Sequence, residues 1–226
     1  MKAVVLLSGG LDSTVCMAVA ASKGYEVLPI SFNYHQRHNR ELLCAQEVAK
    51  HYGVKNHLLI QTNMDAIGGS ALTDAGIVVP AGTVERQDIP ATYVPARNLI
   101  FLSYALGYAE VSGADAIFIG VNALDYSGYP DCRPEFIALF QQLADYSTKA
   151  AVQDGRHIKV QTPLLQLTKK DIVLLGTKLQ APLYLTTSCY LGEEAACGEC
   201  DSCRLRLKGF AEAGIPDPIL YRGRGG

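Results

Sequence analysis

Several features are missing from this chain of 226 residues, and each absence narrows what the protein does. No apolar run approaches the ~20 residues that a membrane-spanning helix needs, and the apolar stretch at residues 3–7 ends at Ser8 and Gly9. Neither sign of charge dominates, because 20 basic side chains stand against 22 acidic ones and the formal net charge is -2. The sequence therefore predicts a cytoplasmic protein with no membrane span and no overall attraction to nucleic acid or membranes.

Two common nucleotide-binding motifs are also absent. No Gly-Lys-Ser or Gly-Lys-Thr follows a glycine after a four-residue gap, which excludes a Walker loop, and no Gly-x-Gly-x-x-Gly is present, which excludes the dinucleotide type. The first apolar run is followed instead by Ser-Gly-Gly-Leu-Asp-Ser at positions 8–13.

This segment has the form of a phosphate-binding turn between a buried strand and a helix. The strand ends at Leu7, two glycines let the backbone turn tightly, and the helix begins near Asp12. Amide N–H groups and a helix N-terminus then converge on one spot, where they bind an anion without a lysine. We predict that the pyrophosphate part of ATP is bound by Leu7, Ser8, Gly9, Gly10, Leu11, Asp12, Ser13 and Thr14, the alternative being a plain strand-to-helix turn.

Short strand-like runs alternate with longer helical ones, which is typical of a parallel sheet wrapped by helices. Strands are predicted at 3–7, 26–32, 57–61, 115–120 and 157–161, and helices at 12–22, 39–52, 97–111 and 133–151. Thr168 and Asp171 form a capping box that begins a further helix, which ends before Pro182. Residues 62–96 lack periodicity and are predicted to be a lid or substrate loop. We expect an open α/β domain over residues 1–187 with helices on both faces of the sheet.

The C-terminal segment 188–226 is predicted to be a small metal-binding unit packed on that domain. Four of the seven cysteines follow the spacing C-x7-C-x2-C-x2-C, namely Cys189, Cys197, Cys200 and Cys203. Four thiolates so close together can surround one zinc ion, and they leave no open position on it, so the ion is predicted to be structural. A [4Fe–4S] cluster with similar spacing is the alternative.

The loop at 8–13 resembles that of the PP-loop ATP pyrophosphatases, which hold the β- and γ-phosphates as a leaving group and release AMP and pyrophosphate. Further motifs lie at residues 33–38, 92–98 and 125–133 (Asp-Tyr-Ser-Gly-Tyr-Pro-Asp-Cys-Arg). With the cysteine unit, they make nearly the whole chain similar to the 7-cyano-7-deazaguanine synthases, PP-loop ligases of queuosine biosynthesis. Two positions depart from that pattern: Asn33, where the family often has Asp, and Ala96, where it often has Gly.

The resemblance implies an ATP-dependent ligase that uses one site twice. The carboxylate of 7-carboxy-7-deazaguanine is adenylated and ammonia displaces AMP to give an amide. The amide oxygen is then adenylated, and loss of AMP gives the nitrile. The resemblance also implies Mg²⁺ and a homodimer. No glutaminase domain fits in the remaining residues, so we expect ammonia to be supplied from outside the chain.

Cationic side chains near the loop are candidates for stabilising charge on phosphate. Arg97, Lys169 and Arg133 lie at or just after loop-to-helix junctions at the same edge of the predicted sheet, although each is also compatible with an ordinary surface charge. By resemblance, Asp12 helps to hold Mg²⁺. The predicted catalytic residues are Asp12, Ser13, Arg97 and Lys169.

A deazaguanine ring presents adjacent N–H donors that a carboxylate accepts, and a flat face on which an aromatic ring can stack. Polar and aromatic residues that follow the second and fourth predicted strands offer such groups, although the second of these segments is also compatible with a structural turn. The predicted substrate-binding residues are Gln36, Arg37, Asp125, Tyr126, Tyr129, Asp131 and Arg133. Cys132 has no evident base beside it and is predicted to be structural.

Two other functions are compatible with the loop. A PP-loop enzyme that modifies tRNA needs a basic surface or an RNA-binding module, and the sequence shows neither. A nucleotide-binding adaptor without chemistry is the second, and the intact Asp12 and Ser13 argue against it. We therefore expect a small-molecule substrate and no nucleic acid.

Overall fold

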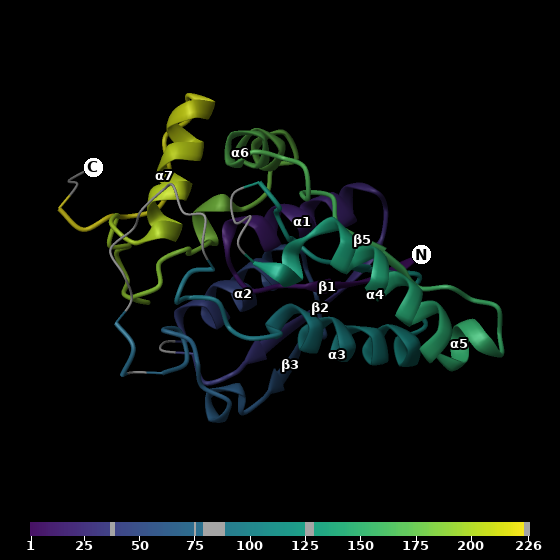
Figure 1. Ribbon diagram of the computed structural model, residues 1–226. Helices are drawn as coiled ribbons and strands as arrows, with labels where there is room; N and C mark the ends of the chain where they lie inside the picture. The colour runs from purple at the N-terminus through teal and green to yellow at the C-terminus, as the bar shows by residue number, and fades with distance from the viewer. Residues whose placement is uncertain (37–38, 75, 79–88, 125–128, 224–226) are drawn as a thin grey trace.

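The computed structural model describes residues 1–36, 39–74, 76–78, 89–124 and 129–223. Within these ranges, five parallel strands form one open sheet in the order β3-β2-β1-β4-β5 (Figure 1). The strands are β1 (Lys2–Leu6), β2 (Glu26–Asn33), β3 (Leu58–Gln61), β4 (Ala116–Phe118) and β5 (Lys159–Gln161). In the centre of the sheet, Val4 is paired with Leu28 on one side and with Ile117 on the other. The predicted parallel sheet is confirmed.

Helices cover both faces of the sheet, and two more pack outside the first layer. The helices are α1 (Leu11–Ser22), α2 (Arg40–His51), α3 (Arg97–Ser112), α4 (Pro134–Ser147), α5 (Lys149–Val152), α6 (Lys169–Lys178) and α7 (Asp201–Ala213). Helices α3 and α4 lie on one face, α1 and α2 on the other, α6 packs on α1, and α7 packs on α6 (Figure 1). None of these described helices has the length and apolar character needed to cross a membrane.

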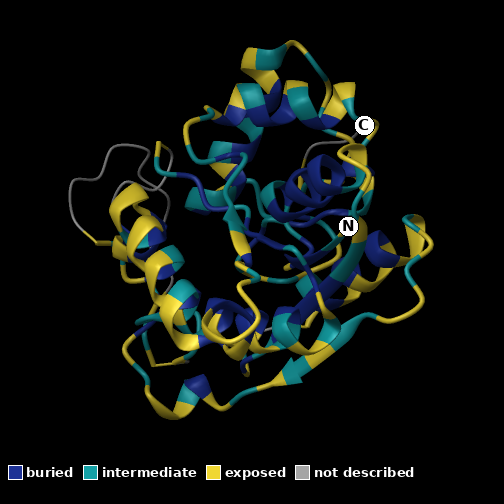
Figure 2. Cartoon of the chain, turned by 90° about the vertical axis from the view of Figure 1, so that its right-hand side faces the viewer, coloured by how far each residue is buried: buried dark blue, intermediate teal, exposed yellow. Residues whose placement is uncertain are grey.

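Side chains along β1 point alternately to the two faces of the sheet, and each face has its own hydrophobic core. Val4 and Leu6 point into the core beneath α3 and α4, whereas Val5 and Leu7 point into the core beneath α1. Buried residues therefore gather in the sheet and on the inward sides of the helices around it (Figure 2). Such a sheet, covered on both faces, is expected of parallel strands with apolar runs.

Helix α1 is buried on nearly all sides, from Leu11 through Ala20 with few exceptions. The sheet covers one side, and α6 covers the other at close range. A Cβ on Gly176 of α6 would lie 2.8 Å from Val15 Cγ2, so only glycine allows this approach. This packing brings the start of α6 next to the first turn of α1, which is where the functional site lies.

The strand order reverses between β1 and β4, which creates a crevice at the carboxyl ends of the strands. The turn after β1 and the turn after β4 lie side by side there. A Cβ on Gly120 would lie 3.0 Å from the carbonyl oxygen of Asp12. Ligands bind at such switch points in open α/β sheets.

Two helix predictions were incomplete. The single helix expected at 133–151 is two helices, α4 and α5, because the backbone of Thr148 is extended (φ -106, ψ 142) and its hydroxyl caps α5 by accepting from the Ala151 N–H. Helix α7 was not predicted, although Asp201 in its first turn and Gly214 (φ 68) after its end are ordinary helix signals.

A few residues in the described parts of the segment 62–96 are buried in the core, whereas most are half-buried or exposed. Met64, at the start of a short 3-10 helix (Met64–Ala66), and Val94 are buried against the face covered by α3. The proposed lid function of this segment stays a prediction, and residues 75 and 79–88 lie outside the described residues.

A buried hydrogen-bond chain holds the end of β1 in place and gives a pH prediction. Ser31 Oγ donates to the Leu7 carbonyl oxygen and lies 2.7 Å from His57 Nε2. Burial lowers the pKa of His57 below its ordinary value, so the folded state disfavours the charged imidazole. The unfolded chain therefore takes up more protons as the pH falls below about 6.5, and the free energy of unfolding is expected to fall with it.

The measurement is urea unfolding at pH 8 and pH 5.5. His57→Asn is expected to lose less stability between these two pH values than the wild type. The exposed His51, changed to Asn, serves as the control and is expected to behave like the wild type. Equal pH dependence in all three proteins would contradict the role given to His57.

Candidate active site

The turn after β1 presents backbone N–H groups at the N-terminus of α1. Gly10 is the N-cap residue, with an extended backbone (φ -81, ψ 168). The N–H of Ser8 donates to Ser13 Oγ at 3.2 Å, and the N–H of Gly10 donates to Ser8 Oγ at 3.2 Å. Hydroxyl groups thus accept from amides that a bound anion can also use, as is usual at helix N-termini.

Gly9 permits the close approach of this turn to α2. Its φ is +84, and a Cβ would lie 2.1 Å from the Glu41 carbonyl oxygen and 2.7 Å from the Ala45 nitrogen. Both are backbone atoms of α2, so neither can rotate away. We expect Gly9→Ala to destabilise the fold by roughly 2–4 kcal/mol, because the substitution combines backbone strain with a forced displacement of α2.

Gly24 provides a matched control for this substitution. Its φ is +79, yet a Cβ there would meet no atom within 4 Å. Gly24→Ala therefore adds the strain without the clash and is expected to cost about 1 kcal/mol. Chemical denaturation of both variants distinguishes the two effects, and equal losses would show that the contact with α2 is unimportant.

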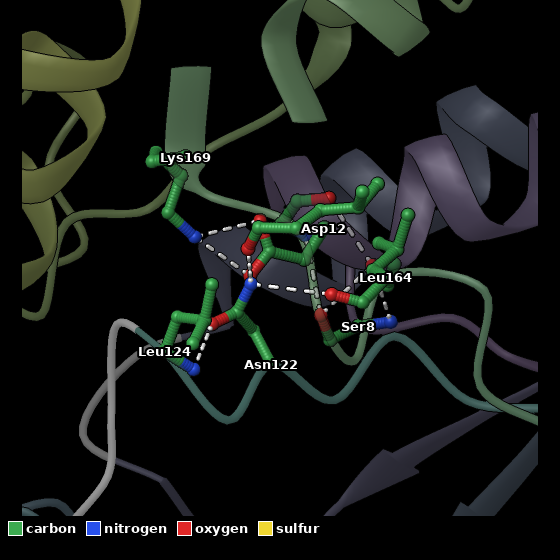
Figure 3. Close-up of polar contacts among 9 residues, drawn as sticks. Ser8, Asp12, Asn122, Leu124, Leu164 and Lys169 are labelled. Carbon is green, nitrogen blue, oxygen red and sulfur yellow. Dashed lines mark hydrogen bonds and ion pairs between the residues drawn. The ribbon is translucent and has the colours of Figure 1, made fainter. Parts of the chain in front are cut away.

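Asp12 and Lys169 form an ion pair at the centre of the site, although they are 157 positions apart in the chain (Figure 3). Lys169 Nζ lies 2.9 Å from Asp12 Oδ1 and 2.8 Å from Oδ2. Lys169 is 8 % exposed, so the pair is largely shielded from water. The predicted capping box is confirmed: Thr168 accepts from the Asp171 N–H, and this fixes the first turn of α6 that carries Lys169.

Asn122, just after β4, holds the segment that leads into α6. Its Nδ2 donates to the carbonyl oxygen of Leu164 at 3.3 Å (Figure 3) and to that of Leu167. Its Oδ1 accepts from the Leu124 N–H at 2.9 Å. Asn122 therefore connects the switch point of the sheet to the segment before α6, and this segment positions Lys169.

One cavity of about 260 Å³ opens at this edge of the sheet. The predicted catalytic residues Asp12, Ser13, Arg97 and Lys169 all line it. Of the predicted nucleotide-binding residues, Leu7, Ser8, Gly10, Leu11, Asp12 and Ser13 line it. Gly9 and Thr14 are not among the lining residues; Thr14 is fully buried in α1, and its hydroxyl has no hydrogen-bond partner in the described structure.

Arg97, at the start of α3, lies in the wall of this cavity beside Tyr34 and Glu41. The Tyr34 hydroxyl and the Glu41 carboxyl both lie near enough to its guanidinium group to interact with it electrostatically. Burial raises the pKa of Glu41 to about 7, and Arg97 opposes that rise. This part of the cavity therefore combines a cation, a carboxyl group and aromatic rings.

The predicted substrate-binding residues do not all lie at the cavity. Gln36 and Tyr129 line the cavity. Asp131 is buried outside the lining, with its Oδ2 accepting from the Asn98 N–H at 2.9 Å, and Arg133 is exposed at the start of α4. Arg37, Asp125 and Tyr126 lie outside the described residues. Substrate contacts by Asp131 and Arg133 stay predictions, and the geometry gives Asp131 a role in fixing the start of α3.

Cys132 behaves as a buried structural residue. Burial raises the pKa of its thiol to about 12, so the reactive thiolate is disfavoured. The Asn98 side-chain amide donates to its sulfur at 3.2 Å.

Several cavity residues were missed from the sequence. Asn122 and Tyr34 each follow a strand at the carboxyl edge and could have been found by the rule that located Gln36. Other lining residues lie on helices or in loops with no recognisable signal, among them Glu41, Tyr190 and Arg206.

The four cysteines of the C-terminal segment converge as predicted. All four Sγ atoms lie within 4.8 Å of one another, and Cys197 Sγ is 3.9 Å from Cys203 Sγ. Sulfurs at about 2.3 Å from one tetrahedral ion would be about 3.8 Å apart, so the set fits a single metal ion. Backbone N–H groups of Glu199 and Cys200 donate to Cys197 Sγ, each at 3.4 Å, and support negative charge on the sulfur.

Comparisons with known proteins show the family of this chain. The family model described as "Queuosine biosynthesis protein QueC" matches residues 2–214. The chain is 62% identical over 224 residues to "7-cyano-7-deazaguanine synthase 2" of Desulfitobacterium hafniense (strain Y51), covering 99% of this chain and 94% of that protein. It is 58% identical over 223 residues to the 7-cyano-7-deazaguanine synthase of Acetivibrio thermocellus, covering 99% of both chains. The chain therefore belongs to the QueC family of queuosine biosynthesis proteins.

Proposed function

We propose that this protein is an ATP-dependent ligase that converts 7-carboxy-7-deazaguanine and ammonia into 7-cyano-7-deazaguanine. The observation that carries the proposal is the shared cavity: the phosphate-binding turn with the Asp12–Lys169 pair and the group around Arg97 line the same space. One site with both parts can serve two successive adenylations, first of the acid and then of the amide. The relatives named 7-cyano-7-deazaguanine synthase support a deazaguanine as the substrate.

At the phosphate end, the N–H groups of Ser8 and Gly10 are proposed to donate to the pyrophosphate part of ATP in place of the hydroxyls that they now meet. Lys169 Nζ is a cation held at the mouth of this turn, where negative charge increases as the bond between the α- and β-phosphates breaks. The same two features act in both adenylations. In this proposal, each adenylation releases pyrophosphate, and the displacement or elimination that follows it releases AMP.

Asp12 is proposed to hold Mg²⁺. A carboxylate has about four acceptor positions, and Lys169 takes two of them, so positions remain for a hard cation. When bound, the ion would neutralise phosphate charge. Lys169 keeps the carboxylate oriented.

At the other end, Arg97 is proposed to pair with the carboxylate of the substrate, which a guanidinium binds through two hydrogen bonds. The Tyr34 hydroxyl lies beside Arg97 in the wall of the cavity. The Tyr129 hydroxyl lies 3.0 Å from Thr92 Oγ1. The ring of Tyr129 is proposed to contact the flat face of the deazaguanine ring, and Gln36 is proposed to contact the edge of the deazaguanine ring.

We propose that the cysteine site holds zinc and that the ion is structural. Four convergent sulfurs leave no open coordination position, so no chemical step passes through it. A [4Fe–4S] cluster bonds each cysteine to a different iron and needs the sulfurs farther apart. Elemental analysis is expected to give one zinc per chain, and a brown protein with iron and labile sulfide would contradict this.

We also propose a homodimer, as in the family that the sequence resembles. Exposed apolar side chains lie at helical spacing on the outer side of α4, at Leu139 (64%), Leu143 (50%) and Tyr146 (83%). Light scattering is expected to give twice the chain mass, and Leu143→Lys is expected to shift it toward one chain.

The proposed function is tested by incubation with ATP, Mg²⁺, ammonium and 7-carboxy-7-deazaguanine, followed by mass spectrometry. The nitrile is expected with two AMP per product. Formation of ADP in place of AMP would contradict the assigned cleavage site, and AMP release without nitrile would contradict the assigned substrate.

A further inference from the structure

Arg206 is a buried cation that the proposed reaction does not use. It lies on α7, three positions after Cys203, and is only 1% exposed. Arginine is rarely buried so completely unless its charge is paired. Here the partner is Asp217, whose two carboxylate oxygens accept from Nε at 2.8 Å and from Nη2 at 2.9 Å.

The remaining hydrogen bonds of Arg206 go to the segment 183–186. Nη1 donates to Thr186 Oγ1 at 2.7 Å, and Nη2 donates to the Leu183 carbonyl oxygen at 3.3 Å. Arg206 itself also lines the cavity. The guanidinium group therefore ties the C-terminal segment to residues 183–186.

The next residue, Thr187, contacts the phosphate-binding turn. Its N–H donates to the Gly9 carbonyl oxygen at 3.0 Å, and a Cβ on Gly10 would lie 3.5 Å from the Thr187 carbonyl oxygen. Two hydrogen bonds, one from Arg206 to Thr186 and one from Thr187 to Gly9, are joined by the peptide bond between the two threonines and so connect Arg206 to Gly9. The planar guanidinium group suits this role, because it binds a carboxylate and a hydroxyl at the same time in fixed directions.

We propose that Arg206 is a positioning residue that holds the phosphate-binding turn in its binding geometry through Thr186 and Thr187, and so sets the affinity for the pyrophosphate part of ATP. This inference rests on the proposed function. A buried ion pair between Arg206 and Asp217 adds little stability by itself, since desolvation offsets much of the attraction. Its effect is to fix the geometry.

Thr186→Val tests this most directly, because it removes the hydroxyl that Arg206 reaches and leaves the Arg206–Asp217 pair intact. Thr186→Ser keeps the hydroxyl and is the matched control. Arg206→Lys keeps the charge and loses the planar fork, and Lys208→Met, an exposed change on the same helix, controls for α7. Calorimetry measures the binding of α,β-methylene-ATP and of AMP to each metal-loaded protein.

Thr186→Val is expected to weaken the binding of α,β-methylene-ATP about five- to tenfold, the size of one ordinary net hydrogen bond, and to leave AMP binding within twofold. Arg206→Lys is expected to weaken the ATP analogue at least as much, whereas Thr186→Ser and Lys208→Met match the wild type. Equal weakening of both ligands, or unchanged binding of the analogue in Thr186→Val, would overturn the inference. A wild-type protein that binds no ATP analogue would instead refute the proposed function on which the inference rests.

Discussion

Lys169→Met is expected to lower kcat/KM by about 10³-fold. The substitution removes a cation that lies within 2.9 Å of both carboxylate oxygens of Asp12 and leaves that carboxylate without its partner in a largely shielded site. It also removes the charge proposed to stabilise the departing pyrophosphate. The measurement is steady-state release of AMP, with the melting temperature measured in parallel.

Lys170→Met is the matched control, because Lys170 is the next residue of α6 and is exposed. It is expected to match the wild type. Asp12→Asn and Lys169→Met are expected to be strongly non-additive, with the double variant no slower than the slower single variant, since each change already disrupts the same pair. If Lys169→Met kept activity within tenfold of the wild type, the ion pair would have no part in the reaction.

Removal of the metal is expected to unfold the C-terminal segment and to abolish ATP binding. Among the described residues, the buried part of the core around the cysteines consists of Cys189, Cys200, Cys203 and Ala196, so the segment has little apolar burial of its own. Structural zinc supplies about 10–16 kcal/mol in small zinc domains. We expect Cys200→Ser, or a strong chelator, to lower the melting temperature by more than about 10 °C.

The chain offers a control for this change within its own cysteines. Cys44→Ala alters a buried cysteine on α2, outside the metal site, and is expected to retain one ion per chain and full ATP binding. Circular dichroism measures the loss of α7, and calorimetry measures ATP binding. If the metal-free protein kept its melting temperature and its ATP affinity, the metal would be dispensable for both.

Much of the fold could be predicted because its signals are local. Apolar runs located all five described strands to within one or two residues, and the capping box at Thr168 located the start of α6. The edge of the sheet that carries the site also followed from local signals, because carboxyl ends of parallel strands share one edge. Asp12, Arg97 and Lys169 were accordingly expected near one another, and they line one cavity.

What the sequence could not reveal depends on contacts between distant segments. The Asp131 side chain turns to the Asn98 N–H, which no spacing rule predicts. The contacts of Arg206 depend on α7, whose first turn also carries the metal-binding residue Cys203. The break at Thr148 could not be predicted either, because a continuous helix and a new helix capped by Thr148 differ little in free energy.

The distance along the chain between Asp12 and Lys169 also affects how the protein matures. Asp12 leaves the ribosome early, whereas its partner follows 157 residues later, and the helix packed on that partner later still. A Cβ on Gly209 of α7 would lie 2.5 Å from Lys169 Cγ, so the final position of the lysine depends on a helix close to the C-terminus. We therefore expect the ion pair, and with it the proposed nucleotide binding, to reach its final geometry only after α7 has docked.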